Sequence, residues 1–164
     1  MLNFKTALNN KDFKVISELA KTIWTEHYTP IIGIEQVKYM LDKFQSQKAI
    51  KKQVMDDNYM YYILSNESIT IGYISIKKND DTLFLSKLYI DKHNRGKGFG
   101  KLAMNFIEEL AKNLNCNKIY LTVNKYNTNS IKTYKKVGFN IIEELVIDIG
   151  NGFIMDDFKM EKLI

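Results

Sequence analysis

A loop of glycine and basic residues carries the clearest chemistry in this sequence. It is Arg95-Gly96-Lys97-Gly98-Phe99-Gly100, followed by Lys101, and an apolar run over 83–90 precedes it. Apolar residues recur at helical spacing after it, over 102–114. The first turn of a helix has unpaired amide N–H groups and partial positive charge, and glycines let the backbone approach a phosphate closely. This order of strand, loop and helix predicts a pyrophosphate-binding site.

Two other phosphate-loop patterns fit the sequence less well. The Walker A pattern is absent, because Lys101 is followed by Leu102 instead of serine or threonine. The dinucleotide pattern is present as Gly98-x-Gly100-x-x-Ala103. It also needs an acidic residue after the next strand to bind the ribose, and Asn124-Lys125 stands there. Both alternatives are therefore disfavoured.

Composition indicates one globular domain over 1–164, with 45% hydrophobic and 26% charged residues. The net charge of +5 is spread over the chain, so we expect no nucleic-acid partner. The single cysteine, Cys116, excludes an internal disulfide, and with two histidines it argues against a metal site. The chain start does not resemble a signal peptide and no apolar run would span a membrane, so we expect a cytoplasmic protein without a membrane partner.

Hydrophobic periodicity predicts an α/β fold, a mixed sheet with helices on both faces. Asn9-Asn10-Lys11-Asp12 supplies the N-cap of a first helix, and Thr29-Pro30 is expected to end it. A second helix follows Gly33. The other predicted helices cover 47–54, 102–114 and 127–137, and the strands cover 2–7, 59–64, 69–77, 83–90, 118–123, 139–149 and 153–163. The strands on either side of the glycine loop should form a parallel, right-handed crossover.

Two motifs together carry a family resemblance. The loop contains Arg95-x-x-Gly98-x-Gly100, and a later helix contains Asn127-x-x-Ser130-x-x-x-Tyr134, ahead of Gly138-Phe139. This combination resembles the GNAT superfamily of acetyl-coenzyme-A-dependent N-acetyltransferases. The closing stretch 151–160 is similar to the last hairpin of bacterial members, including polyamine-acetylating enzymes. The resemblance implies a mostly antiparallel sheet of about seven strands, in which the parallel fourth and fifth strands splay apart as a V.

The resemblance implies acetyl-coenzyme A as cosubstrate, without a metal. The strand backbone at Leu88, Tyr89 and Ile90 would pair with the pantetheine arm. The amides from Arg95 to Lys101 would hold the pyrophosphate, which agrees with the independent interpretation of the loop. Further cofactor contacts would come from Asn127, Ser130 and Tyr134.

Catalytic roles also follow from the resemblance. Tyr134 would give a proton to the departing coenzyme A thiolate, although its spacing also fits a core tyrosine of an amphipathic helix. The amide of Leu88 would stabilise the oxyanion. Many members have a glutamate base on the strand before the loop, but this strand has none.

Four residues are candidates for acceptor binding or proton removal, and all four also fit ordinary surface positions. They are Glu26 and His27 near the end of the first helix and Asp156 and Asp157 on the last strand. The resemblance implies acetyl transfer to a primary amine of a small molecule, such as a polyamine, or of a protein. The alternative is a non-catalytic coenzyme A sensor with the same fold. Family members often form dimers, so a homodimer is one expectation.

Overall fold

The computed structural model describes residues 1–164, and these residues form two compact units. The first contains Met1–Lys77 and Ser86–Ile107, and the second contains Lys78–Leu85 and Glu108–Ile164. The single domain over 1–164 stays a prediction. None of the helices combines the length and the apolar character needed to cross a membrane.

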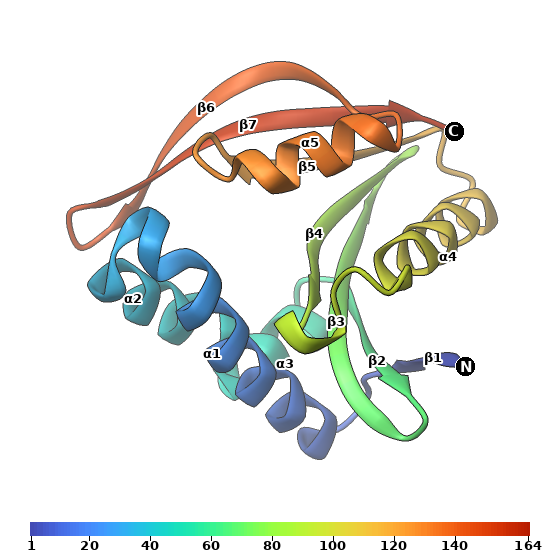
Figure 1. Cartoon of the computed structure of the whole chain (residues 1–164), viewed down its shortest axis with the longest axis horizontal. Helices are drawn as coiled ribbons and strands as arrows, with labels where there is room; N and C mark the ends of the chain where they lie inside the picture. The colour runs from blue at the N-terminus through green and yellow to red at the C-terminus, as the bar shows by residue number, and fades with distance from the viewer. The chain divides into compact units, whose positions relative to one another are not determined.

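Seven strands form one mixed sheet, as expected. In chain order they are β1 (Leu2–Thr6), β2 (Tyr59–Asn66), β3 (Ile69–Asn79), β4 (Thr82–Ile90), β5 (Lys118–Asn124), β6 (Asn140–Gly150) and β7 (Phe153–Leu163). Hydrogen-bonded neighbours follow the order β1-β2-β3-β4-β5-β7-β6 (Figure 1). The β4–β5 pair is parallel, from Thr82 opposite Lys118 to Phe84 opposite Tyr120. The fold class is therefore confirmed, while the V-shaped splay stays a prediction.

The first unit begins with three helices, α1 (Asn10–Ile32), α2 (Ile34–Gln45) and α3 (Gln47–Met55). The side chain of Asn9 caps α1 as predicted, by accepting from the amide of Asp12 at 3.0 Å. The predicted end at Thr29-Pro30 is wrong, because α1 passes through Pro30 to Ile32. Proline removes one amide donor, but this costs little in the last turn, where Gly33 N–H still donates to the Thr29 carbonyl at 3.0 Å.

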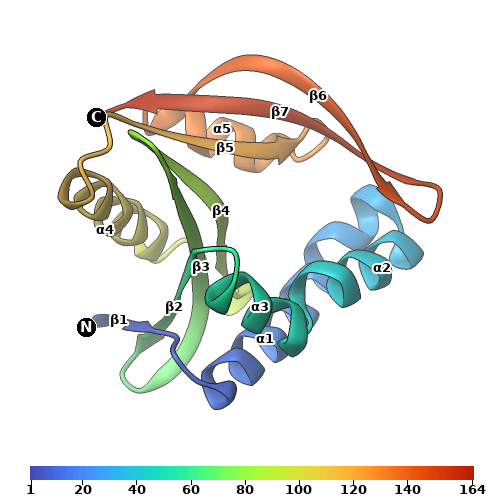
Figure 2. The ribbon, with the colours of Figure 1, turned by 180° about the vertical axis from the view of Figure 1, so that it is seen from behind.

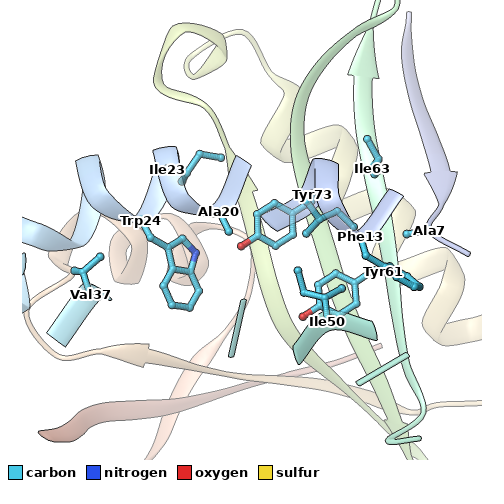
Figure 3. Packing of buried hydrophobic residues seen from close by; sticks show 11 residues of the cluster. Ala7, Phe13, Ala20, Ile23, Trp24, Val37, Ile50, Tyr61, Ile63 and Tyr73 are labelled. Carbon is cyan, nitrogen blue, oxygen red and sulfur yellow. The ribbon is translucent and has the colours of Figure 1, made fainter. Parts of the chain in front are cut away.

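Helices cover both faces of the strands in the first unit (Figures 1 and 2). Side chains alternate along β2, so Tyr61 packs in the core with α1 and α3, whereas Tyr62 meets Phe106 of α4 (Phe99–Asn113). Phe106 also stacks on Phe4 of β1, with ring centroids 4.1 Å apart. The cluster beside α1 is shown in Figure 3 and consists of Ala7, Phe13, Ile16, Ala20, Ile23, Trp24, Val37, Ile50, Tyr61, Ile63 and Tyr73.

A buried polar network lies within this cluster. Gln45, which is 1% exposed, accepts from the Tyr73 hydroxyl at 2.7 Å and donates to the Tyr61 hydroxyl at 3.0 Å. The Tyr61 hydroxyl then donates to Gln53 at 2.6 Å. Each of these hydroxyl and amide groups has a hydrogen-bond partner within the network. The network therefore joins α2 and α3 to β2 and β3 without the cost of leaving these buried polar groups unsatisfied.

The second unit is built on β5, β7 and β6, with α5 (Thr128–Lys136) lying along them (Figures 1 and 2). One face of β5 is buried through Ile119, Leu121 and Val123. Gly138 ends α5 with φ of 101°, and a Cβ there would lie 3.3 Å from Cε of Lys162. Gly138 directly follows the C-cap residue Val137, and its left-handed backbone is the one that a glycine at the C′ position commonly adopts.

Candidate functional site

The predicted anion loop connects the end of β4 to α4, inside the first unit. A short 3₁₀ turn, Lys92–Asn94, comes first and is capped by the Asp91 carboxylate, which accepts from the His93 amide at 2.8 Å. Arg95 then donates from Nε to the carbonyl of Ile90 at 2.9 Å. The entry to the loop is thus held by its own side chains. Helix α4 begins at Phe99, three residues before the predicted start at residue 102, so its first turn includes the end of the glycine loop.

Successive backbone amides in the loop lack protein acceptors. From Gly96 to Lys101 no amide donates to the protein, and the regular bonding starts with Leu102, which donates to the Gly98 carbonyl at 3.2 Å. Gly96 and Gly98 have φ of 73° and 83°, a left-handed region that favours glycine. A Cβ added at either position would meet nothing within 4 Å, so the backbone faces open space. Unpaired amides at a helix start are the arrangement that binds phosphate oxygens.

Positive charge surrounds these amides. Lys97 donates to the side-chain oxygen of Asn94 at 3.3 Å, and Lys101 is exposed in the first turn of α4. Both ammonium groups add to the partial positive charge of the helix start. The loop is therefore electrostatically suited to a polyanion.

The strand segment before the loop is held closely against β3. A Cβ on Gly72 would lie 2.2 Å from the carbonyl oxygen of Tyr89, so only glycine allows this approach. The amide of Asp91 donates to the carbonyl of Ile71 at 2.8 Å. These contacts fix the backbone of Leu88, Tyr89 and Ile90, all of them half-buried.

Helix α1 meets the same end of β4. Glu26 forms an ion pair of 3.1 Å with Lys92, and the His27 ring contacts Tyr28 edge-on at 4.8 Å. The hydroxyl oxygens of Tyr28 and Tyr89 lie 2.9 Å apart. Sequence reasoning missed Tyr28, although its position four residues after Trp24 places both aromatic rings on one face of α1.

The second unit carries the other predicted cofactor residues on α5. Asn127 is the N-cap residue and is only 4% exposed, yet its side chain forms no capping bond. Ser130 lies one turn further on and is half-buried. Tyr134 is half-buried and contacts Phe139 edge-on, with ring centroids 5.6 Å apart. Helix α5, with its N-cap residue, therefore carries Asn127, Ser130 and Tyr134 at the spacing of the predicted cofactor motif.

The two predicted acidic residues of β7 differ in environment. Asp156 forms an ion pair with Lys125 at 2.8 Å, and Glu144 contacts the same ammonium at 3.1 Å. Hydrogen bonds to Asp156, and secondarily to Glu144, raise the pKa of Lys125. Asp157 is 4% exposed. The negative charge of Asp156 is thus already balanced by a lysine.

A cavity of about 820 Å³ lies elsewhere in the first unit, along α2, α3 and the middle of β4. Its wall contains none of the predicted site residues. It is lined by lysines and aspartates around apolar groups such as Phe44, Met55 and Tyr59. No cluster of three or more His, Cys, Asp or Glu side chains could hold a metal ion.

Comparisons with known proteins agree with the fold. A family model described as the acetyltransferase (GNAT) family matches residues 17–139. A probable spermine N(1)-acetyltransferase of Bacillus subtilis subsp. natto (strain BEST195) is 38% identical over 64 residues, which are 38% of this chain and 42% of that relative. The chain matches less than half the length of the curated relatives.

Two solved structures share the fold. The PaiA N-acetyltransferase from Thermoplasma acidophilum, in complex with coenzyme A, has a TM-score of 0.82 and 21% identity, covering 100% of this chain and 99% of that chain. A chimera of the spermidine N-acetyltransferase SpeG from Vibrio cholerae and hSSAT has a TM-score of 0.73 and 23% identity, covering 99% and 95%. Since the family model matches most of the sequence, the chain belongs to the acetyltransferase (GNAT) family.

Proposed function

We propose that this chain transfers the acetyl group of acetyl-coenzyme A to a primary amine. The observation that carries the proposal is the run of backbone amides from Gly96 to Lys101, which have no protein acceptor at the start of α4. A pyrophosphate supplies oxygens for such amides, and membership of the GNAT family supports coenzyme A as the molecule that carries it.

The donor would be held by backbone groups and by α5. We assign the pyrophosphate to the amides of Gly96 to Lys101 and the pantetheine arm to the backbone of Leu88, Tyr89 and Ile90. Asn127, Ser130 and Tyr134 are the assigned contacts on α5. The side chain of Asn127 does not cap α5 although it stands at the N-cap position, which supports a role other than capping, such as a cofactor contact.

The chemistry requires an amine nitrogen to attack the thioester carbonyl. A C–N bond forms, the C–S bond breaks, the amine loses one proton and the thiolate gains one. We assign the oxyanion contact to the Leu88 amide and the proton donated to the thiolate to Tyr134, whose phenol is protonated at neutral pH.

Polyamines are the acceptor class that the comparisons support. One relative is named a probable spermine N(1)-acetyltransferase, and one fold neighbour derives from a spermidine N-acetyltransferase. Protein amines are the second class to test, because no residue of the chain by itself selects the acceptor.

The proposal is tested by measuring release of free coenzyme A thiol with a panel of amines. The panel contains spermine, spermidine, monoamines and peptides with a free terminus. We expect transfer to at least one primary amine. Tight binding of coenzyme A without transfer to any amine would support the sensor alternative, and absence of binding would contradict both functions.

A further inference from the structure

Two tyrosine hydroxyls meet at the strand end where the acetyl group is proposed to lie. The hydroxyl of Tyr28 on α1 is 2.9 Å from the hydroxyl of Tyr89 on β4. Their rings are nearly perpendicular, at 84°, with centroids 6.2 Å apart. Tyr89 directly follows Leu88, the residue assigned to the oxyanion contact. The pair therefore lies at the same end of β4 as the backbone assigned to the thioester.

Aromatic packing holds this hydroxyl pair in place. Trp24 contacts Tyr28 and Tyr89 edge-on, with centroid distances of 5.6 and 5.7 Å. Tyr73 contacts Tyr89 at 5.5 Å and is itself fully buried. Figure 3 shows the indole nitrogen of Trp24 directed toward the hydroxyl of Tyr73. The two phenols are thus positioned by a rigid aromatic cluster.

Other polar groups near this strand end already have structural roles. Glu26 is paired with Lys92 at 3.1 Å, and the Asp91 carboxylate caps the 3₁₀ turn. Earlier on β4, where family members often have a glutamate, Lys87 donates to the Ser86 hydroxyl at 2.7 Å. A carboxylate base next to Leu88 is therefore missing from β4.

We propose that Tyr89 and Tyr28 relay the proton that the acceptor amine loses. In this chain the relay would take the place of the glutamate base that many family members have on the corresponding strand. This inference rests on the proposed acetyl transfer. In the relay, the Tyr89 oxygen takes the N–H proton as its own hydroxyl proton passes to the Tyr28 oxygen. The Tyr28 hydroxyl proton passes to water. Each phenol ends neutral, and one proton has moved from nitrogen to solvent.

A relay fits phenols better than direct base catalysis does. A phenol ionises near pH 10, so at neutral pH it is neutral and cannot hold an extra proton as a stable base. Burial, the largest cause, raises the pKa of the neighbouring Tyr73 hydroxyl well above that value. A hydroxyl that accepts one hydrogen bond and donates another can still pass a proton on.

The test is a double-mutant cycle on turnover. Tyr28→Phe and Tyr89→Phe keep the rings and remove the hydroxyls. Since either loss interrupts the same relay, each variant should lower kcat by about 100-fold, the lower end of the usual range for proton transfer. The double variant should be no slower than the slower single variant. The Kd for coenzyme A and the midpoint of urea unfolding should stay close to the wild-type values.

Tyr62→Phe is the matched control, because it removes a tyrosine hydroxyl that lies on the α4 side of β2. Its kcat should equal that of the wild type. Wild-type kcat in both single variants, or losses that multiply in the double variant, would overturn the relay and leave acetyl transfer intact. A wild-type chain that transfers no acetyl group would overturn the relay together with the proposed function.

Discussion

The guanidinium of Arg95 donates from Nε to the carbonyl oxygen of Ile90 at 2.9 Å. This bond joins the start of the glycine loop to the last residue of β4. Arg95 is the only arginine in the chain. Its side chain therefore does more than add positive charge, since it also sets the path by which the backbone enters the loop.

Arg95→Lys should weaken coenzyme A binding although the charge is kept. Lysine has no donor at the Nε position, so the bond to Ile90 is lost, and a net hydrogen-bond contribution of about 1 kcal/mol corresponds to roughly fivefold in Kd. Isothermal titration with coenzyme A measures the change. Lys112→Arg, a basic exchange at the far end of α4, is the control. Equal Kd values for wild type and Arg95→Lys would show that this bond does not organise the loop.

Gly98→Ala should reduce coenzyme A affinity more than it reduces stability. Alanine at φ of 83° costs about 1–2 kcal/mol in backbone strain, and its methyl group would occupy the open space above the amides. Gly152→Ala is the matched control for Gly98→Ala, because Gly152 has φ of 76° and equally open surroundings in the turn between β6 and β7.

Both glycine variants should therefore lose similar unfolding free energy, as measured by urea denaturation. Only Gly98→Ala should lose coenzyme A affinity. Equal affinity losses in the two variants would indicate general destabilisation and remove the loop from the proposed site.

Tyr134→Phe should lower turnover by roughly ten- to a thousandfold, in line with loss of a general acid. The edge contact of its ring with Phe139 is retained, so folding and coenzyme A binding should change little. Steady-state kinetics with the best acceptor of the panel give the effect, and titration with coenzyme A supplies the binding control. Unchanged turnover would exclude Tyr134 as the proton donor.

Tyr73→Phe should destabilise the first unit. It removes the donor to the side-chain oxygen of Gln45, and an unsatisfied buried acceptor costs about 1–3 kcal/mol. Tyr62→Phe should cost only about 0.5 kcal/mol, because the Tyr62 hydroxyl has a weak contact of 3.9 Å with the sulfur of Met60. Urea denaturation compares the two variants, and equal losses would show that the Gln45 network does not stabilise the fold.

Stability should fall as pH rises from about 10 toward 12. Burial is the main cause that raises the pKa of Tyr61 from 10.0 to about 12. Between these values the unfolded chain releases a proton that the folded protein keeps, so the free energy of unfolding decreases with pH. The effect is absent below pH 10, where both states are protonated. Tyr61→Phe should show a shallower decline in urea denaturation above pH 10, and parallel declines would refute the assignment.

The glycine loop and α5 could be predicted because their signals are local. The left-handed backbone at Gly96 and Gly98 suits residues without a Cβ, and the presence of α4 follows from helical spacing within a short segment, although its start at Phe99 precedes the predicted one. The same is true of the α5 motif that carries Asn127 and Tyr134. Local patterns were therefore enough to predict the loop and the α5 motif as structural features, and their role in binding the donor stays a prediction.

Other features depend on tertiary structure and could not be predicted. Strict alternation along a strand would put Ile69 on the same face as Ile71, but Ile69 is 67% exposed whereas Ile71 is buried, because the β2–β3 pairing shifts register at Leu64 and Ser65. The contact between Tyr28 and Tyr89 joins residues 61 positions apart. Hydrophobic periodicity specifies which side of an element is buried, but it does not specify which hydroxyls meet there.

Titration of isotope-labelled protein with coenzyme A, followed by amide NMR, tests most directly the claim that the loop binds the donor. We expect the amide resonances from Gly96 to Lys101 to show the largest downfield shifts, because these N–H groups acquire phosphate acceptors. Gly152, in a turn of similar backbone geometry, should shift little. Saturable binding that leaves the loop amides unchanged would show that coenzyme A binds the protein elsewhere than at the glycine loop.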